Sequence, residues 1–339
     1  MSSAIELRGI RKTFGSKVAV TSLDLKIETG SVVAFLGPNG AGKTTTIRMI
    51  MSILFPDSGQ ISVLGKSSAV ESKDRIGYLP EERGLYRKMK VGAFLTYMAR
   101  LKGVEGSKVK PLVSDWLARV GLGDCERKKC EELSKGMQQK IGFVSSVIHN
   151  PDLVILDEPF SGLDPVNARL LRELIDDLHN AGKTIIFSTH VMAHAEALCD
   201  HVIMINRGDK VLDEPMSRIR SNFDPRAVLL EPVTGNSAAQ NESNNLAYAQ
   251  AISVLPTVHS YTMPKLGQPA FGITLHEDAD PQQAISQLVS AVPVRRVELK
   301  RVRLEDVFIR LVGENGGTGQ DGEAAGLELA ANRGPLEGE

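Results

Sequence analysis

The sequence predicts an α/β protein in which a parallel β-sheet is followed by a second, smaller α+β domain. Two observations indicate the parallel sheet. Residues 31–37, 153–159 and 184–190 are apolar runs of strand length, and a segment with helical character follows each of them. Such runs are typical of parallel strands that are buried on both faces. Near residue 220 the composition changes, and a new alternation of strands and helices continues to about residue 313.

The bulk composition limits the function classes. The chain has 339 residues, enough for one large and one small domain, and its net charge of -1 provides no general attraction to nucleic acid. Three cysteines in this length do not form a disulfide framework. The charged N-terminus lacks the apolar core of a signal peptide, and no run of 18 apolar residues is present. If the protein serves transport, we expect the pore to belong to another polypeptide.

The first domain, expected over residues 1–220, begins with strands. Residues 4–30 alternate in the manner of strands, and 31–37 add a buried strand that leads through a glycine-rich loop into a helix. A helical subdomain is expected over about 88–150, and Ser134 is the N-cap candidate of its last helix. The remaining elements are two short strands at 61–66 and 75–80, and a closing hairpin at 201–214.

The second domain is expected over residues 223–313. Residues 233–245 are polar and are expected to form a flexible insertion, and 314–339 are rich in glycine and glutamate and are expected to be a flexible tail. The predicted elements between these segments are strands at 226–232, 271–277 and 294–299 and helices at 246–255, 282–292 and 304–312.

The first chemical motif is the glycine-rich loop. GPNGAGKT fits the pattern G-x-x-x-x-G-K-[ST] between a strand and a helix, where backbone N–H groups and the helix N-terminus bind phosphate. Lys43 would reach the β- and γ-phosphates, and the Thr44 hydroxyl would bind Mg²⁺. The alternative is a chance glycine-rich turn. The predicted nucleotide contacts of this loop are Gly37, Pro38, Asn39, Gly40, Ala41, Gly42, Lys43, Thr44 and Thr45.

The second motif supplies what a phosphate loop needs. The run LVILDEP places Asp157 at the C-terminal end of a buried strand, where ligands bind in open α/β sheets. Asp157 would hold Mg²⁺, and Glu158 could polarise the attacking water as a general base. The alternative is a strand that ends in a surface acidic pair.

With three further motifs, the chain resembles an ATP-binding-cassette (ABC) ATPase, a class of P-loop NTPase. LSKGMQQ at 133–139 resembles the family signature, SGLDP at 161–165 resembles the D-loop, and STH at 188–190 resembles the switch histidine. The stretch 76–91 and the C-terminal pattern at 303–313 are similar to the ATP-binding subunits of sodium-extruding, NatA-like exporters and their drug, lipid and polysaccharide-exporting relatives.

The resemblance implies roles for individual residues. Phe14 matches the aromatic residue that stacks on adenine, although it could instead be a core or hairpin residue. Ser134 and Gly136 would contact the γ-phosphate of ATP that is held by a partner subunit. Asp164 would communicate across the interface, and His190 would sense the γ-phosphate.

The resemblance also implies partners. Two subunits, expected to be a homodimer, would enclose two ATP molecules and drive a separately encoded transmembrane permease of the exporter type. The chain would then lie at the cytoplasmic face of the membrane, bound through the permease, without nucleic acid. The alternatives are a soluble ABC ATPase that acts on ribosomes or nucleic acid, and a nucleotide-binding regulator that does not hydrolyse ATP.

The sequence departs from the family pattern at three positions. Glu81 stands where glutamine is usual, so a carboxylate would lie near Mg²⁺ and is predicted to bind the ion; the alternative is that it faces water. Lys135 replaces a second glycine of the signature, and Met137 replaces a glutamine. Ser134 and Gly136 remain, so the predicted anion site is retained.

Overall fold

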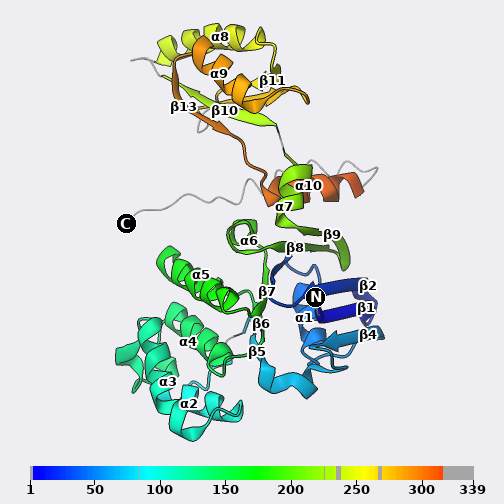
Figure 1. The fold of residues 1–339 in the computed structure, drawn as a ribbon, viewed down its shortest axis with the longest axis vertical. Coiled ribbons are helices and arrows are strands. Elements are labelled where there is room, and N and C mark those ends of the chain that lie inside the picture. Colours follow the sequence, from blue (N-terminus) through cyan, green and yellow to red (C-terminus); the bar gives the residue numbers. More distant parts are fainter. Residues whose placement is uncertain (1–2, 83, 225, 234–237, 266–268, 316–339) are drawn as a thin grey trace. The chain divides into compact units, whose positions relative to one another are not determined.

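The computed structural model describes the chain except for residues 1–2, 83, 225, 234–237, 266–268 and 316–339 (Figure 1). The contacts divide the chain into two units. The first contains Met1–Met216 together with the chain from Leu304, and the second contains Ser217–Arg303. The predicted tail lies outside the described residues from residue 316 onward.

A six-stranded sheet forms the centre of the first unit and confirms the predicted α/β class. Its strand order is β5-β6-β7-β3-β8-β9, and every neighbouring pair is parallel except β8 with β9. The antiparallel pair confirms the predicted closing hairpin. The bounds are β3 (Val32–Leu36), β5 (Ile76–Leu79), β6 (Leu153–Asp157), β7 (Thr184–Thr189), β8 (His201–Asn206) and β9 (Asp209–Pro215).

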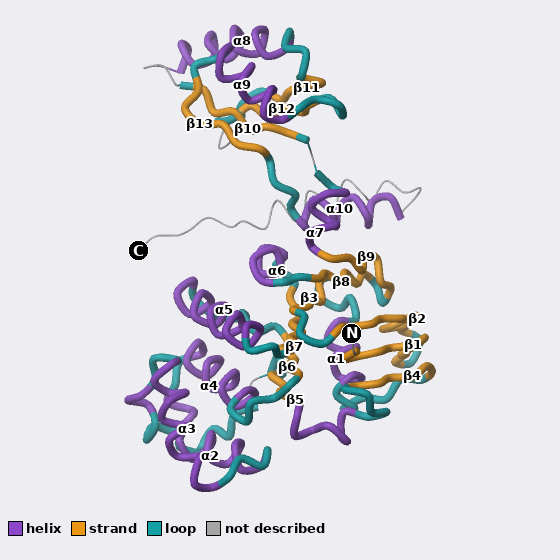
Figure 2. The backbone as a smooth tube through the Cα atoms, viewed as in Figure 1, coloured by secondary structure: helices purple, strands orange, loops and turns teal. Residues whose placement is uncertain are grey.

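A second, three-stranded antiparallel sheet covers one face of the six-stranded sheet together with α1 (Lys43–Ile50) (Figure 2). Its order is β2-β1-β4, with β1 (Ser3–Phe14), β2 (Lys17–Glu28) and β4 (Ser58–Val63). Aliphatic and aromatic side chains from all three layers form one buried core, including Ile5, Leu7, Ile10, Leu23, Ile47, Ile50, Phe35, Ile155, Ile186 and Ile203. This core fixes the position of the loop between β3 and α1.

Helices cover the other face of the six-stranded sheet. Figure 2 shows α4 and α5 on the side of the six-stranded sheet that lies away from α1. Ser134 is the N-cap of α4, as the sequence predicts. The bounds are α2 (Val91–Leu101), α3 (Gly106–Arg119), α4 (Lys135–Val147), α5 (Pro165–Asn180) and α6 (Met192–Leu198), with 3₁₀ turns at Ala69–Arg75, Gly123–Cys125 and Cys130–Glu132.

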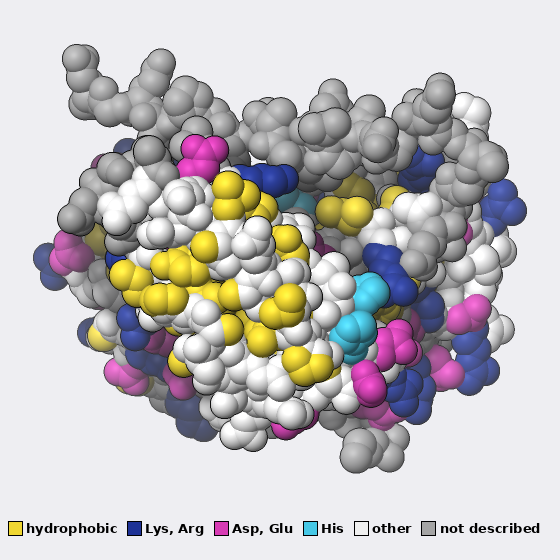
Figure 3. All heavy atoms as spheres, turned by 90° about the horizontal axis from the view of Figure 1, so that it is seen from above, with side chains coloured by type: hydrophobic (Ala, Val, Ile, Leu, Met, Phe, Trp, Pro, Cys, Tyr) yellow, Lys and Arg dark blue, Asp and Glu magenta, His cyan; other side chains and the backbone are white. Residues whose placement is uncertain are grey.

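The second unit is a four-stranded antiparallel sheet with two helices. Its strand order β11-β12-β10-β13 and its chain order β10-α8-β11-β12-α9-β13 form a split βαβ arrangement. Figure 3 shows hydrophobic side chains gathered on the face seen from above, and apolar residues of both helices, such as Leu246 and Val289, are exposed. The bounds are β10 (Ala227–Pro232), α8 (Ala238–Ser253), β11 (Val258–Thr262), β12 (Phe271–Leu275), α9 (Pro281–Ala291) and β13 (Val294–Leu299).

The structure differs from the predicted elements at three places near this unit. The helix α8 begins at Ala238, inside the stretch predicted to be a flexible insertion. Residues 238–245 are mostly polar and lack the apolar face by which a helix is recognised from sequence. The edge strand β11 buries only its first residue and therefore lacks the alternation of a strand. The short helix α7 (Met216–Asn222) at the boundary is also absent from the prediction.

The last described helix, α10 (Leu304–Asn315), belongs to the first unit. Leu304 and Val307 are buried, α10 packs against α6, and the Leu304 N–H donates a hydrogen bond to Glu196 Oε1 at 2.6 Å. The second unit therefore runs from Ser217 to Arg303, whereas the sequence places its limits at 223 and 313. Residues 304–313 continue the alternation of strands and helices in the sequence, but the buried side chains of Leu304 and Val307 belong to the first unit.

Candidate functional site

The loop between β3 and α1 has a shape that depends on glycine. Gly37 and Gly42 have φ values of +150° and +112°, which residues with a Cβ rarely adopt. A Cβ on Gly37 would lie 2.1 Å from the Ile205 carbonyl oxygen, and one on Gly42 would lie 2.6 Å from the Ala19 carbonyl oxygen. The backbone of β8 and of β2 therefore lies directly against the loop, and only glycine fits at these two positions.

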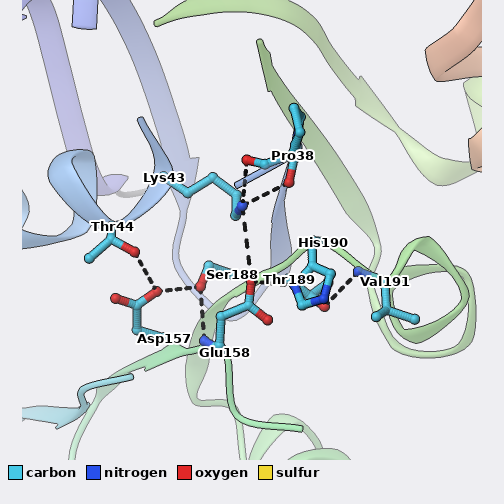
Figure 4. Close-up of polar contacts among 10 residues, drawn as sticks. Pro38, Lys43, Thr44, Asp157, Glu158, Ser188, Thr189, His190 and Val191 are labelled. Carbon is cyan, nitrogen blue, oxygen red and sulfur yellow. Dashed lines mark hydrogen bonds and ion pairs between the residues drawn. The ribbon is translucent and has the colours of Figure 1, made fainter. Parts of the chain in front are cut away.

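Lys43 begins α1 directly after this loop, and its side chain is buried. Its Nζ donates hydrogen bonds to the carbonyl oxygens of Gly37 at 2.7 Å and Pro38 at 3.1 Å (Figure 4). Burial lowers the pKa of Lys43, and the carboxylates of Glu158, Asp157 and Glu81 oppose this shift. An ammonium group with carbonyl partners at the mouth of a phosphate loop is suited to bind an anion.

Asp157 ends β6 and is fully buried. Its Oδ1 accepts hydrogen bonds from the hydroxyls of Thr44 at 3.2 Å and Ser188 at 2.5 Å. Its Oδ2 is also buried, and no group in the described part of the chain donates a hydrogen bond to it. A buried carboxylate that has one oxygen on a threonine hydroxyl and the other without a donor fits a Mg²⁺ ion, which is usually bound by one or two carboxylates.

Glu158 follows Asp157 with a φ of +49°, in the left-handed region that residues other than glycine rarely occupy. Its N–H donates to Ser188 Oγ at 2.9 Å, and its Oε1 lies 3.0 Å from His190 Nδ1 and 4.0 Å from Lys43 Nζ. Unusual backbone conformations of this kind cluster at functional sites. The structure thus brings the carboxylate between a cation and an imidazole, as Figure 4 shows.

The residues predicted to serve a partner's nucleotide form a separate group at the starts of α4 and α5. Ser134 is exposed, and its hydroxyl accepts the Met137 N–H at 3.3 Å. Asp164 accepts the Asn167 N–H at 2.9 Å as the N-cap of α5, and this hydrogen bond lowers its pKa. A Cβ added to Gly136 would lie 3.7 Å from the side chain of Asn167, so the two helix starts are neighbours.

Phe14 and Glu81 both lie at exposed positions. Phe14, at the end of β1, is 51% exposed, and Lys12 Nζ lies 5.7 Å from the centre of its ring. Glu81 follows β5 and borders a cavity of about 400 Å³ with Gln139 and Ser161. The Glu81 carboxylate acts electrostatically on Lys43, and its role as a metal ligand remains a prediction.

Comparison with known proteins identifies the family. Residues 20–161 match the family model described as ABC transporter. The uncharacterized ABC transporter ATP-binding protein YhaQ of Bacillus subtilis is 41% identical over 307 residues, which cover 90% of this chain and 97% of YhaQ. This chain belongs to the ABC transporter ATP-binding proteins. The ABC family binds and hydrolyses ATP and works with transmembrane components.

Other similar proteins agree with this family. The ABC transporter ATP-binding protein NatA of Bacillus subtilis is 43% identical over 57% of this chain and 80% of its own length. Nod factor export ATP-binding protein I of Rhizobium sp. is 32% identical over 91% of this chain and 97% of its own. A solved ATP-binding subunit of an ABC transporter superposes with a TM-score of 0.61, at 29% identity, over 65% of this chain and 93% of that one. Among the helices of the described residues, none has both the length and the apolar character needed to cross a bilayer.

Sequence reasoning missed two buried polar residues of this ABC protein. Ser188 joins Asp157 and Glu158 through its hydroxyl. Gln139, in the signature, donates from Nε2 to the Pro159 carbonyl oxygen at 2.9 Å and so ties α4 to the residues after Glu158. A polar residue near the end of the apolar run TIIFSTH was the available signal for Ser188.

Proposed function

We propose that this chain is the ATP-hydrolysing subunit that powers an exporter-type ABC permease through ATP-dependent dimerisation. The observation that carries the proposal is the placement of the Glu158 carboxylate, 3.0 Å from His190 and 4.0 Å from Lys43 at the phosphate loop. A carboxylate at this place can accept the proton of a water that attacks the γ-phosphate. His190 would orient Glu158 and contact the γ-phosphate on the same side.

The remaining groups of the loop would bind the nucleotide. Lys43 and the loop N–H groups would hold the β- and γ-phosphates, and Phe14, which is half exposed, would stack on adenine. Thr44 and Asp157 would hold Mg²⁺, supported by the buried Asp157 Oδ2 that lacks a donor in the described chain, and Glu81 would add negative charge nearby. When bound, Mg²⁺ would neutralise charge on the transferring phosphoryl group.

The second half of each site would come from another copy of the chain. Ser134 and Gly136 lie at the N-terminus of α4, where a hydroxyl and backbone N–H groups can bind an anion. The sequence has one phosphate loop and one signature, so two identical copies would supply both halves of two sites. Asp164 and the start of α5 lie beside Gly136 and would meet the same interface.

Dimerisation has a direct test. In Glu158→Gln, which should bind ATP without hydrolysing it, sedimentation with Mg-ATP should give the mass of two chains and sedimentation with ADP the mass of one. A Ser134→Arg change in the same protein should prevent the ATP-dependent dimer, because a bulky side chain would fill the anion site. A single-chain mass at saturating ATP would contradict the dimer proposal.

Export rests on similarity to a protein named for Nod factor export, which aligns over 91% of this chain. We expect the chain to bind a separate transmembrane permease at the cytoplasmic face of the membrane. The tagged chain should therefore retain a membrane protein during purification in detergent, and reconstituted with that protein it should hydrolyse ATP faster than alone. Purification without any membrane protein, and no change in rate on reconstitution, would contradict the coupling.

A further inference from the structure

Ser188 links the two acidic residues at the end of β6. The strands β6 and β7 are parallel neighbours, and their register places Ser188 beside Asp157. The Ser188 side chain is fully buried, its hydroxyl donates to Asp157 Oδ1 at 2.5 Å, and the same oxygen accepts the Glu158 N–H at 2.9 Å (Figure 4).

The Ser188 hydroxyl uses both its donor and its acceptor capacity in this link, which fixes its orientation. A serine hydroxyl has one hydrogen, and here it is given to Asp157. A lone pair of the same oxygen accepts the N–H of Glu158, so the hydroxyl cannot rotate without breaking a hydrogen bond. Because Oδ1 receives donors from Ser188 and Thr44, the carboxylate is held with Oδ2 as the oxygen that lacks a donor in the described chain.

We propose that Ser188 is a positioning residue that fixes the orientation of the Asp157 carboxylate beside Thr44, where it would hold Mg²⁺, and holds Glu158 in its left-handed backbone conformation. The proposal rests on the function proposed above, because it assumes that Asp157 binds the metal and that Glu158 is the base. Residues that orient a metal ligand by hydrogen bonding commonly change metal affinity by about 10–100-fold when they are removed. Ser188 does not touch the nucleotide in this scheme, so it should act on the metal and not on phosphate binding by the loop.

Thr184 provides a matched control on the same strand. Its side chain is 2% exposed, and its hydroxyl accepts the Gly30 N–H at 2.9 Å at the opposite end of β7. Thr184→Val and Ser188→Ala both remove a buried hydroxyl that accepts a backbone N–H. A purely structural role for Ser188 therefore predicts similar behaviour in the two variants.

The experiment measures the Mg²⁺ affinity of the protein–nucleotide complex. Fluorescent mant-ADP is bound in EDTA, and Mg²⁺ is then titrated into the full-length protein. Ser188→Ala should raise the apparent Kd for Mg²⁺ by about 10–100-fold, and its affinity for mant-ADP in EDTA should stay within about twofold of the wild type. Ser188→Thr keeps a hydroxyl and should restore Mg²⁺ affinity, and Thr184→Val should leave it unchanged.

Ser188→Cys, which keeps the side-chain size but donates weakly, replaces the alanine variant if that variant does not fold, and it should also weaken Mg²⁺ binding. Equal Mg²⁺ affinities in Thr184→Val and in the alanine or cysteine variant of Ser188 would overturn the inference. Asp157→Asn separates the two levels of the argument. If it weakens Mg²⁺ binding while Ser188→Ala does not, only this inference fails; if Asp157→Asn also has no effect, the proposed metal site fails.

Discussion

Replacing Gly42 by alanine should lower the nucleotide affinity more than the same replacement at any other glycine of the phosphate loop except Gly37. A residue with a Cβ at a φ of +112° is strained by about 1–3 kcal/mol. The added Cβ would also lie 2.6 Å from the Ala19 carbonyl oxygen, and overpacking of this kind costs about 1–3 kcal/mol. The combined penalty is about 2–6 kcal/mol, which the free loop can relieve by moving but the nucleotide-bound loop cannot.

Gly40 is the matched control, because it lies in the same loop with a φ of +78° but has no atom within 4 Å of an added Cβ. Gly40→Ala should carry only the conformational cost of about 1–2 kcal/mol. Titration with mant-ATP and Mg²⁺ should therefore show a loss of about 5–30-fold in affinity for Gly40→Ala and a larger loss, of more than about 30-fold, for Gly42→Ala. Equal losses in the two variants would refute the argument that β2 constrains the loop.

Three further predictions concern stability. Leu304→Ala should lower the free energy of unfolding of the first unit by about 2–5 kcal/mol, because it leaves a cavity where α10 packs on α6; urea denaturation measures this, and an unchanged midpoint would contradict the assignment of α10. Gln139→Leu should cost about 1–3 kcal/mol in the same assay, since the buried Pro159 carbonyl loses its donor; a wild-type midpoint would argue against this hydrogen bond. His149 hydrogen-bonds the Ile76 carbonyl, and burial lowers its pKa from 6.5 to about 4. As the pH falls, His149 is therefore protonated in the unfolded chain before it is protonated in the folded chain. The free energy of unfolding should fall by up to about 3 kcal/mol between pH 6.5 and 4, and that of His149→Gln should fall less over the same range.

The strands that carry the site could be predicted because their burial is visible in the sequence. The strands β3, β6 and β7 are buried along their whole length, so the interior of each strand is largely apolar. Each is followed directly by a residue of the site, namely Gly37, Glu158 or His190. The phosphate loop was equally readable, since Gly37 and Gly42 belong to its sequence pattern and close contacts with β8 and β2 require glycine at these two positions.

Other features could not be read because they depend on contacts between distant segments. The left-handed conformation of Glu158 depends on neighbours such as Ser188, which lies 30 residues away in the sequence. The docking of α10 depends on Glu196, which lies 108 residues before Leu304. The start of α8 was missed because helix formation there leaves no apolar periodicity in the sequence.

The rate of ATP hydrolysis by Glu158→Gln, at saturating Mg-ATP, tests the central claim most directly. Glutamine keeps the side-chain size and cannot accept the proton of the attacking water. Glu173→Gln is the control, because Glu173 forms an exposed ion pair with Arg169 on α5, away from the phosphate loop. We predict that Glu158→Gln binds mant-ATP within a few-fold of the wild type and loses at least about 100-fold in turnover, since a positioned general base contributes about 10²–10⁴-fold. Hydrolysis by Glu158→Gln at the rate of Glu173→Gln would contradict the assignment of Glu158 as the base.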